Sequence, residues 1–247
     1  MSEPLWQWPD LVAAAQGDAD GAPSLPITGF SIDTRSLAPG DVFVALKDAR
    51  DGHAFVPAAF KAGAAAAIVS YAHPRGGFSG ALLRVADPLR ALEAVGRAAR
   101  TRSNARVVAV TGSVGKTGTK EMLRLCLADA GPTHASEKSY NNHWGVPLTL
   151  ARMPASAAYG VFEIGMNHAG EIAPLTRMVR PHVAVITTVD PVHLAYFPSV
   201  EAIAEAKAEI LLGLVPGGTA VLPYDNAHYT LLRERALAVG ARSLSSV

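Results

Sequence analysis

The stretch VVAVTGSVGKTGTKEML, residues 107–123, decides how the second half of this chain is read. A β-branched run, Val107–Val110, ends in a turn bounded by Gly112 and Gly115, and a polar, helix-forming segment follows. Gly-x-x-Gly-Lys-Thr at such a junction is typical of a phosphate-binding loop, in which backbone N–H groups surround phosphate oxygens, Lys116 reaches the β- and γ-phosphates and the Thr117 hydroxyl binds Mg²⁺. The standard spacing has a further glycine where this chain has a valine, so the loop is a shortened form. The stretch therefore predicts a nucleotide site.

Short β-branched runs alternate with helical patterns along the whole chain, which favours an α/β fold. The polar segment 100–106 is the best boundary, and it predicts two domains, residues 1–104 and 105–247. In the second domain the spacing predicts a P-loop-type parallel sheet with crossover helices. The expected strands are 27–32, 42–46, 66–69, 81–85, 107–110, 159–164, 183–187 and 219–222, and the expected helices of the first domain are 6–15, 54–62 and 88–101.

Composition excludes several classes of protein. The chain has 247 residues, is 49% hydrophobic and carries a net charge of +1, so neither disorder nor a basic nucleic-acid-binding surface is expected. The one cysteine, Cys126, lies in an apolar helical run and is expected to be a small buried residue. An acidic N-terminus and the lack of any apolar run near ~20 residues indicate a cytoplasmic protein without a membrane span.

Several polar residues follow strands or interrupt apolar patterns. Glu163 closes an apolar strand, where a carboxylate is costly unless paired, so metal ligation is favoured. His193 follows another strand end, where a surface histidine is an equally ordinary interpretation. Asn141 and Asn142 suit loop capping as well as presenting amides to a substrate.

Lys207 interrupts an apolar stripe on one face of a helix that begins after Ser199 as N-cap. On periodicity alone, the favoured interpretation is a lysine whose stem packs while its ammonium reaches water. The stripe consists of Val200, Ile203, Lys207, Ile210 and Leu214.

Eight segments, in order, carry a resemblance to a known family. They are Ser31–Arg35, Pro39–Phe43, Asp51–His53, Thr111–Thr117 with Thr119–Glu121, Tyr140–Leu148, Phe162–Glu171, His193–Leu194 and Glu205–Glu209. Together they resemble the Mur ligases, the ATP-dependent amide-bond-forming enzymes of peptidoglycan precursor synthesis. The resemblance implies a UDP-sugar-binding first domain and an ATPase second domain.

The resemblance also implies roles for individual residues. For ATP it implies Thr111, Gly112, Ser113, Val114, Gly115, Lys116, Thr117, Gly118 and Asn226. For Mg²⁺ it implies Thr117, Glu163, His193 and Lys207, and for catalysis Lys116, Lys207 and His193. For the UDP-sugar substrate it implies Ser31, Thr34, Arg35, Asp51, Gly52, His53, Asn141 and Asn142. Lys207 matches a lysine that is carbamylated in the family, and burial, by lowering an amine's pKa, would favour its reaction with CO₂.

The segments NNxxGVPLTL and GxNHxGEI are most similar to family members that join D-Ala-D-Ala to UDP-MurNAc-tripeptide through an acyl phosphate. Members have a third domain and a longer central sheet, so the resemblance predicts a truncated chain that is inactive alone. A monomer is favoured, although the sequence does not determine the oligomeric state. Two alternatives stay open: another Mur-type ligase or a folylpolyglutamate synthase relative, and a non-catalytic module that binds nucleotide or UDP-sugar.

Overall fold

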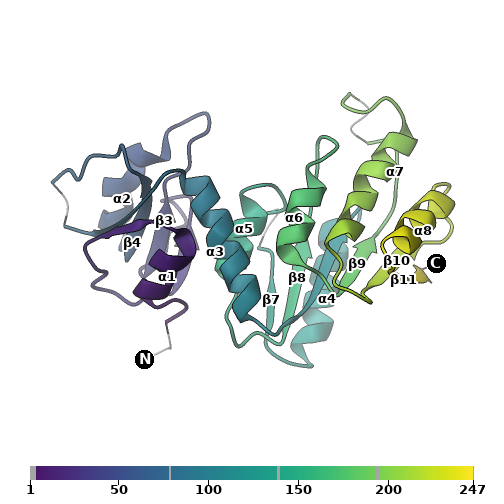
Figure 1. Ribbon diagram of the computed structural model, residues 1–247, viewed down its shortest axis with the longest axis horizontal. Coiled ribbons are helices and arrows are strands. Elements are labelled where there is room, and N and C mark those ends of the chain that lie inside the picture. Colours follow the sequence, from purple (N-terminus) through teal and green to yellow (C-terminus); the bar gives the residue numbers. More distant parts are fainter. Residues whose placement is uncertain (1–3, 78, 138–139, 193–194, 247) are drawn as a thin grey trace. The chain divides into compact units, whose positions relative to one another are not determined.

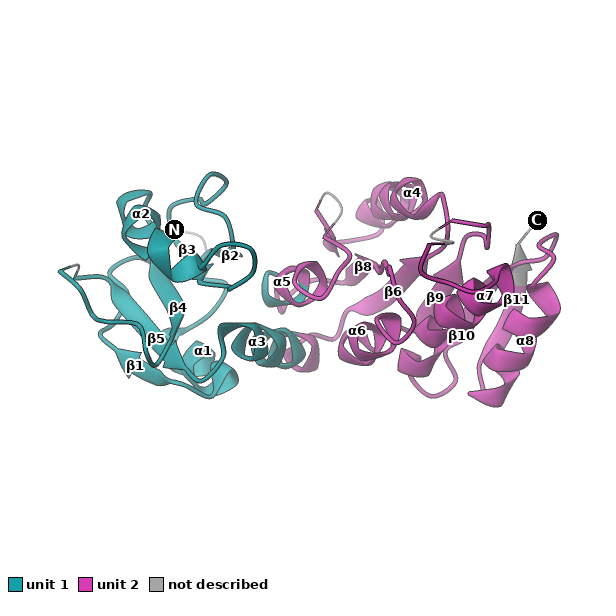
Figure 2. Ribbon diagram, turned by 90° about the horizontal axis from the view of Figure 1, so that it is seen from above, with its two compact units in different colours: residues 1–99, 150–152 teal, residues 100–149, 153–247 magenta. Residues whose placement is uncertain are grey.

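The computed structural model describes residues 4–77, 79–137, 140–192 and 195–246 (Figure 1). The chain divides into two compact units, residues 1–99 with 150–152 and residues 100–149 with 153–247 (Figure 2). The division falls inside helix α3, Pro88–Arg102. Each unit has its own β-sheet, and the two are described separately.

Unit 1 is built on a five-stranded sheet in the order β1-β5-β4-β3-β2. Strands β2 to β5 run parallel, whereas β1 pairs antiparallel with β5. Every residue of β2 and β3 is buried, as expected for parallel strands covered on both faces. The strands are β1 (Asp18–Asp20), β2 (Gly29–Ser31), β3 (Asp41–Val44), β4 (Ala66–Ser70) and β5 (Ala81–Val85); the helices are α1 (Trp8–Ala15), a 3₁₀ helix (Gly52–Phe55), α2 (Val56–Lys61) and most of α3.

Unit 2 is built on a six-stranded sheet in the order β11-β10-β9-β6-β8-β7, and all of its pairings are parallel. Helices connect successive strands, because a parallel pair needs a crossover connection. Helices α4 and α6 lie on opposite faces of the sheet (Figure 2). The strands are β6 (Arg106–Thr111), β7 (Thr133–Ala135), β8 (Tyr159–Glu163), β9 (Val183–Ile186), β10 (Thr219–Pro223) and β11 (Arg242–Ser246). The helices are α4 (Lys116–Ala128), α5 (Gly145–Ala151), α6 (Ile172–Val179), α7 (Val200–Ala208), a 3₁₀ helix (Glu209–Gly213) and α8 (Tyr229–Ala238).

This topology places the functional loops. The carboxyl ends of β6, β8, β9 and β10 meet at one edge of the unit 2 sheet, and in open parallel sheets ligands bind at that edge. The segments that follow these four strands therefore lie together although the chain separates them widely. They are residues 112–115, 164–171, 187–192 and 224–228.

The α/β fold and the eight predicted strands are confirmed, but three strands were missed: β1, β7 and β11. All three lie at sheet edges. An edge strand has a neighbour on one side only, so its sequence is under weaker demand for the apolar pattern that marks a central strand. Asp18–Asp20, for example, is largely exposed.

The prediction that Cys126 is buried is wrong, because its side chain is exposed. It lies on the outward face of α4 with Met122 and Leu125, which are 61% and 58% exposed, opposite the face that carries buried Lys120. No helix within the described part of the chain has both the length and the apolar character needed to span a bilayer.

Candidate functional site

The loop after β6 is shaped by two glycines. Gly112 has φ +153°, and a Cβ there would lie 1.9 Å from the Thr187 Oγ1. Gly115 has φ +83° and is the N-cap of α4. These positions require glycine because the backbone is left-handed at one and crowded at the other. The loop thus opens directly onto the N-terminus of a 13-residue helix, a favourable place for an anion.

The segment after β9 holds the loop in place. The Thr187 hydroxyl donates to the Val114 carbonyl oxygen at 2.5 Å. The Ser113 hydroxyl donates to the Asp190 carbonyl oxygen at 3.1 Å and accepts from the Asp190 N–H at 2.9 Å. Sequence reasoning missed Thr187 and Asp190, although a polar Thr-Thr-Val-Asp run directly after an apolar strand was the available signal.

Lys116 folds back over the loop. Its Nζ donates to the Gly112 carbonyl oxygen at 2.7 Å. Burial lowers the pKa of the Lys116 ammonium, while the nearby Glu163 carboxylate acts in the opposite direction. The Lys116 ammonium therefore lies against the backbone of the loop.

Glu163 joins three segments at the end of β8. Its side chain is buried; Oε2 accepts from the Thr117 hydroxyl at 2.9 Å, and Oε1 accepts from the Asn141 side-chain amide at 2.8 Å. The Glu163 N–H donates to the Ser136 hydroxyl at 3.2 Å. The sequence predicted a carboxylate that needs partners, and the structure supplies them. Asn142 instead caps α5, because its Oδ1 accepts from the Gly145 N–H at 2.9 Å.

Lys207 is 2% exposed, so the interpretation from periodicity alone, in which its ammonium reaches water, is wrong. Helix α7 begins at the predicted N-cap, since the Ser199 hydroxyl accepts from the Ala202 N–H at 3.1 Å. Burial, together with the positive charge of Lys116, lowers the pKa of Lys207 to about 8, and the Asp190 carboxylate partly opposes this. The structure therefore brings Lys207 within electrostatic range of the loop lysine. His193 lies outside the described residues.

The remaining nucleotide-site predictions lie around the same loop. Asn226 donates to the Val189 carbonyl oxygen at 2.9 Å and accepts from the His228 N–H at 3.0 Å, so its amide supports the turn after β10. Gly118 lies in the first turn of α4 with open space where a Cβ would be. Among the described residues, the buried Thr111 hydroxyl has no hydrogen-bond partner.

The substrate-site predictions of unit 1 lie in two turns. At the end of β2, the Ser31 hydroxyl donates to the Asp33 carbonyl oxygen at 2.9 Å, and Thr34 is half-buried in the turn that follows. Exposed Arg35 donates to Asp33 at 2.6 Å, and this hydrogen bond is the main cause that lowers the pKa of Asp33 to about 2. The guanidinium of Arg35 thus lies at the surface with one carboxylate partner.

The second turn follows β3, the strand beside β2, so both turns lie at the same edge of the unit 1 sheet. Asp51 Oδ1 accepts from the His53 N–H at 3.0 Å and lies 2.6 Å from the His53 Nδ1. His53 Nε2 accepts from the Ser70 N–H at 2.9 Å. Both ring nitrogens of His53 are therefore engaged, which positions the turn. Gly52 donates its N–H to the Leu46 carbonyl oxygen at 2.8 Å.

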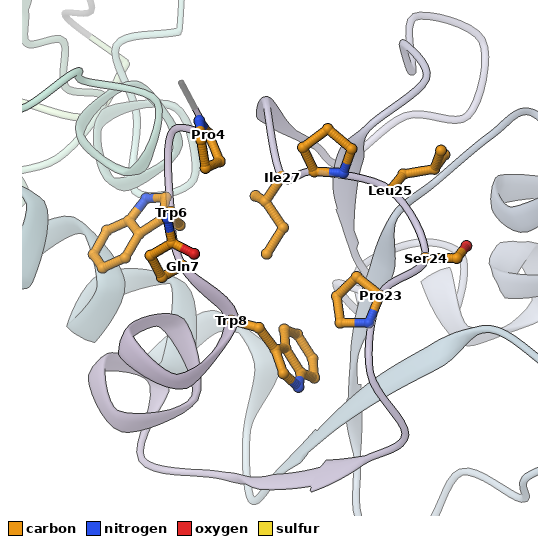
Figure 3. Close-up of a pocket in the computed structure, with 9 residues that line it drawn as sticks. Pro4, Trp6, Gln7, Trp8, Pro23, Ser24, Leu25 and Ile27 are labelled. Carbon is orange, nitrogen blue, oxygen red and sulfur yellow. The ribbon is translucent and has the colours of Figure 1, made fainter. Parts of the chain in front are cut away.

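A cavity of about 320 Å³ lies elsewhere in unit 1, between residues 4–8 and residues 23–27 (Figure 3). Its lining is mostly proline, tryptophan and aliphatic side chains, and none of the described lining residues is charged. None of the predicted site residues lines it.

The residues around the unit 2 loop fit a nucleotide with a divalent cation. The cradle at Gly112 excludes any side chain, the loop lysine supplies positive charge, and Thr117 and Glu163 present two oxygen ligands side by side. Within the described ranges, no group of three or more His, Cys, Asp or Glu side chains could hold a metal. Mg²⁺ is commonly bound by one or two protein oxygen ligands together with phosphates, and the Thr117 and Glu163 oxygens would suit such a site.

Comparison with known proteins gives a consistent answer. Residues 110–246 match the Mur ligase middle domain. A UDP-N-acetylmuramoyl-tripeptide–D-alanyl-D-alanine ligase of Bacillus subtilis is 40% identical over 196 residues, which are 79% of this chain and 43% of that protein. The chain spans about half the length of the curated relatives that it matches.

Solved structures agree with the sequence matches. A crystal structure of MurF from Acinetobacter baumannii superposes with a TM-score of 0.86 at 36% identity, covering 98% of this chain and 53% of that one. MurF ligase from Thermotoga maritima, solved in complex with ADP, gives a TM-score of 0.75 at 30% identity, with 89% and 50% covered.

Proposed function

Because this chain belongs to the Mur ligase family, we propose that it is the part of a D-alanyl-D-alanine-adding ligase that holds ATP and UDP-MurNAc-tripeptide. The relatives that carry this activity are about twice as long, so the complete reaction is proposed for the chain together with the remainder found in them. The proposed setting is the cytoplasm, where ATP and the UDP-linked precursor occur.

In the proposed reaction a carboxylate of the UDP-linked tripeptide attacks the γ-phosphorus of ATP, and ADP leaves. The amine of D-Ala-D-Ala then attacks the acyl carbon, loses a proton and displaces phosphate, leaving an amide bond. Both steps depend on holding reactants in line and on offsetting phosphate charge. The chain's own residues need to bind, orient and neutralise rather than form covalent bonds.

The unit 2 loop has residues for each of these tasks. Lys116 would offset charge on the β- and γ-phosphates, and Thr117 with Glu163 would hold Mg²⁺. When bound, Mg²⁺ would supply further neutralisation of phosphate charge. Asn141 fixes the orientation of the Glu163 carboxylate through a 2.8 Å hydrogen bond. Asn226, Thr111 and the loop backbone complete the proposed ATP site.

Lys207 is proposed to carry a carbamate. The neutral amine would attack CO₂, forming an N–C bond and releasing a proton, which converts a buried cation into an anion with two oxygen atoms. Burial at 2% exposure and a lowered pKa both favour the neutral amine needed for this addition. The carbamate would serve with His193 at a second Mg²⁺.

The two turns of unit 1 are proposed to bind the UDP-sugar. Ser31 ends β2 and Thr34 and Arg35 follow it, while Asp51 to His53 follow β3, so two neighbouring strands present them at one sheet edge. Exposed Arg35 suits a diphosphate because a guanidinium binds phosphate oxygens in pairs.

The single observation that carries the proposal is the 2.9 Å hydrogen bond between Thr117 and the buried Glu163 carboxylate beside a glycine-shaped loop. Isothermal titration calorimetry with MgATP tests it. We expect Lys116→Ala to weaken binding at least about tenfold, because hydrogen bonds to charged groups contribute about 1.5–3 kcal/mol. Lys61→Ala, which removes an exposed lysine of unit 1, is the control. A folded wild-type chain that takes up no MgATP at millimolar concentration contradicts the proposal.

A further inference from the structure

Lys120 is a buried lysine for which the proposed chemistry has no use. It lies in α4 one helical turn after Thr117, and its side chain is 1% exposed. Its Nζ donates to the Ser136 carbonyl oxygen at 2.9 Å and lies 2.8 Å from a carboxylate oxygen of Glu121. Burying an ammonium is costly unless it is paired and hydrogen-bonded. An apolar side chain of similar size would fill this place without that cost, so the charge itself needs an explanation.

Ser136, the residue that Lys120 holds, also contacts the proposed metal site. It directly follows β7, and its N–H donates to the Val161 carbonyl oxygen of β8 at 3.0 Å. Its hydroxyl accepts from the Glu163 N–H at 3.2 Å. Ser136 therefore holds the backbone of Glu163, the residue whose side chain carries the carboxylate.

These contacts close a ring. Thr117 and Lys120 lie on the same face of α4, because residues three apart in a helix are neighbours. Thr117 bonds the Glu163 carboxylate, Lys120 bonds Ser136, and Ser136 bonds the Glu163 backbone. Two residues of α4 therefore hold Glu163. Thr117 bonds its side chain directly, and Lys120 holds its backbone through Ser136.

We propose that Lys120 is a positioning residue for the divalent cation: by anchoring Ser136 it holds the Glu163 carboxylate beside the Thr117 hydroxyl. The inference rests on the proposed nucleotide and metal site, but it assigns a role that neither Lys116 nor Glu163 fulfils. In this role Lys120 acts through Ser136 and is not itself a ligand of the metal. Groups that orient metal ligands from behind typically change metal affinity 10–100-fold when removed.

Three variants separate this role from others. Lys120→Met keeps the length of the side chain and removes its donors. Ser136→Ala removes the hydroxyl that meets Glu163 and leaves the serine backbone in place. Glu121→Gln is the matched control, since it changes the other partner of the same ammonium, on a residue that is 43% exposed.

The measurement is the affinity for ADP by calorimetry, once with Mg²⁺ and once in EDTA, so that the ratio of the two dissociation constants reports the contribution of the metal. In both Lys120→Met and Ser136→Ala we expect this ratio to fall about tenfold, with ADP affinity in EDTA changed less than about twofold. Glu121→Gln is expected to keep the wild-type ratio. If Lys120→Met does not fold, as judged by circular dichroism, Ser136→Ala decides the question.

The outcomes distinguish the inference from the proposed function. A wild-type chain whose ADP affinity ignores Mg²⁺ overturns the metal site and this inference with it. A metal-dependent wild type with unchanged ratios in the folded variants overturns the role of Lys120 alone. An equal loss of affinity with and without Mg²⁺ also overturns it, because it indicates a general structural effect.

Discussion

Lys207 places an ammonium where almost no water reaches it, within the electrostatic influence of a second lysine, Lys116. Its pKa falls from 10.5 to about 8, chiefly through burial. Between these two values the unfolded chain binds more protons at this residue than the folded one, so stability rises with pH across that window. Below pH 8 the folded protein carries the full cost of the buried charge. The lowered pKa therefore marks a cost to folding at neutral pH.

Lys207→Met is expected to stabilise the chain at pH 7 by on the order of 3 kcal/mol. Folding lowers the pKa of Lys207 by about 2.5, and a difference of one in pKa corresponds to about 1.4 kcal/mol. The gain shrinks toward zero as the pH approaches 10.5. Urea unfolding at pH 7 and pH 10, in buffer free of CO₂ so that no carbamate forms, measures both. Lys61→Met, at an exposed lysine, controls for general effects of pH. An unchanged gap at the two pH values contradicts the expectation.

At the residue scale, prediction from the sequence was most accurate where the type of one residue conflicts with the apolar residues around it. Glu163 stood out because a carboxylate closing an apolar strand needs partners, and it has them. Lys207 stood out from its stripe, but whether an ammonium reaches water depends on what covers the helix, which periodicity does not report. Thr187 and Asp190 were missed because their contacts with the loop exist only through the pairing of β6 with β9.

At the scale of elements, α6 depends on residues far from it in the chain. The Glu209 carboxylate accepts from the Gly170 and Ala173 N–H groups at 2.6 and 2.9 Å, beside the start of the helix. Buried Arg100 donates to the Val179 carbonyl oxygen at 2.7 Å at its other end. An eight-residue helix is unstable on its own, so these two ties and its packing hold it.

Arg100→Met is expected to lower the free energy of unfolding by about 2 kcal/mol, because it leaves carbonyl oxygens at the end of α6 without their buried donor. Arg97→Met is the control on the same helix, since the Arg97 side chain is 52% exposed and its ion pair with Glu93 is 3.5 Å long. Its expected effect is below about 0.5 kcal/mol. Denaturant unfolding of both variants tests the difference, and equal losses would mean that the hydrogen bonds to α6 are unimportant.

The difference between central and edge strands explains which elements could be predicted from the sequence. Central strands are buried on both faces, so they can be recognised in the sequence as apolar runs. The edge strands β1, β7 and β11 do not, and the polar Asp18–Asp20 shows why. Ser136 follows one of these missed strands, so its bond to Glu163 could not have been predicted from the sequence.

At the scale of the whole molecule, this chain is similar to about half of each full-length relative. We expect no pentapeptide when the purified chain is mixed with MgATP, UDP-MurNAc-tripeptide and D-Ala-D-Ala, because ligation needs the activated acyl group and the amine to be held together. Mass spectrometry of the products measures this, with the full-length Bacillus subtilis relative as positive control. Formation of pentapeptide by the 247-residue chain would show that the remaining half of the relatives is dispensable.

Strand β6 lies between two strands that come later in the chain, so its sheet cannot form around it until those strands have left the ribosome. Its two neighbours, β8 and β9, are made later, and the loop after β6 is anchored by the contact of Ser113 with Asp190, 77 residues further on. At about 5–20 residues per second, translation of that interval takes roughly 4–15 s. During those seconds the loop after β6 has been synthesised, but the residue that anchors it has not. The loop after β6 therefore acquires its anchored conformation late, only after the strands on both sides of β6 and the Asp190 segment have been synthesised.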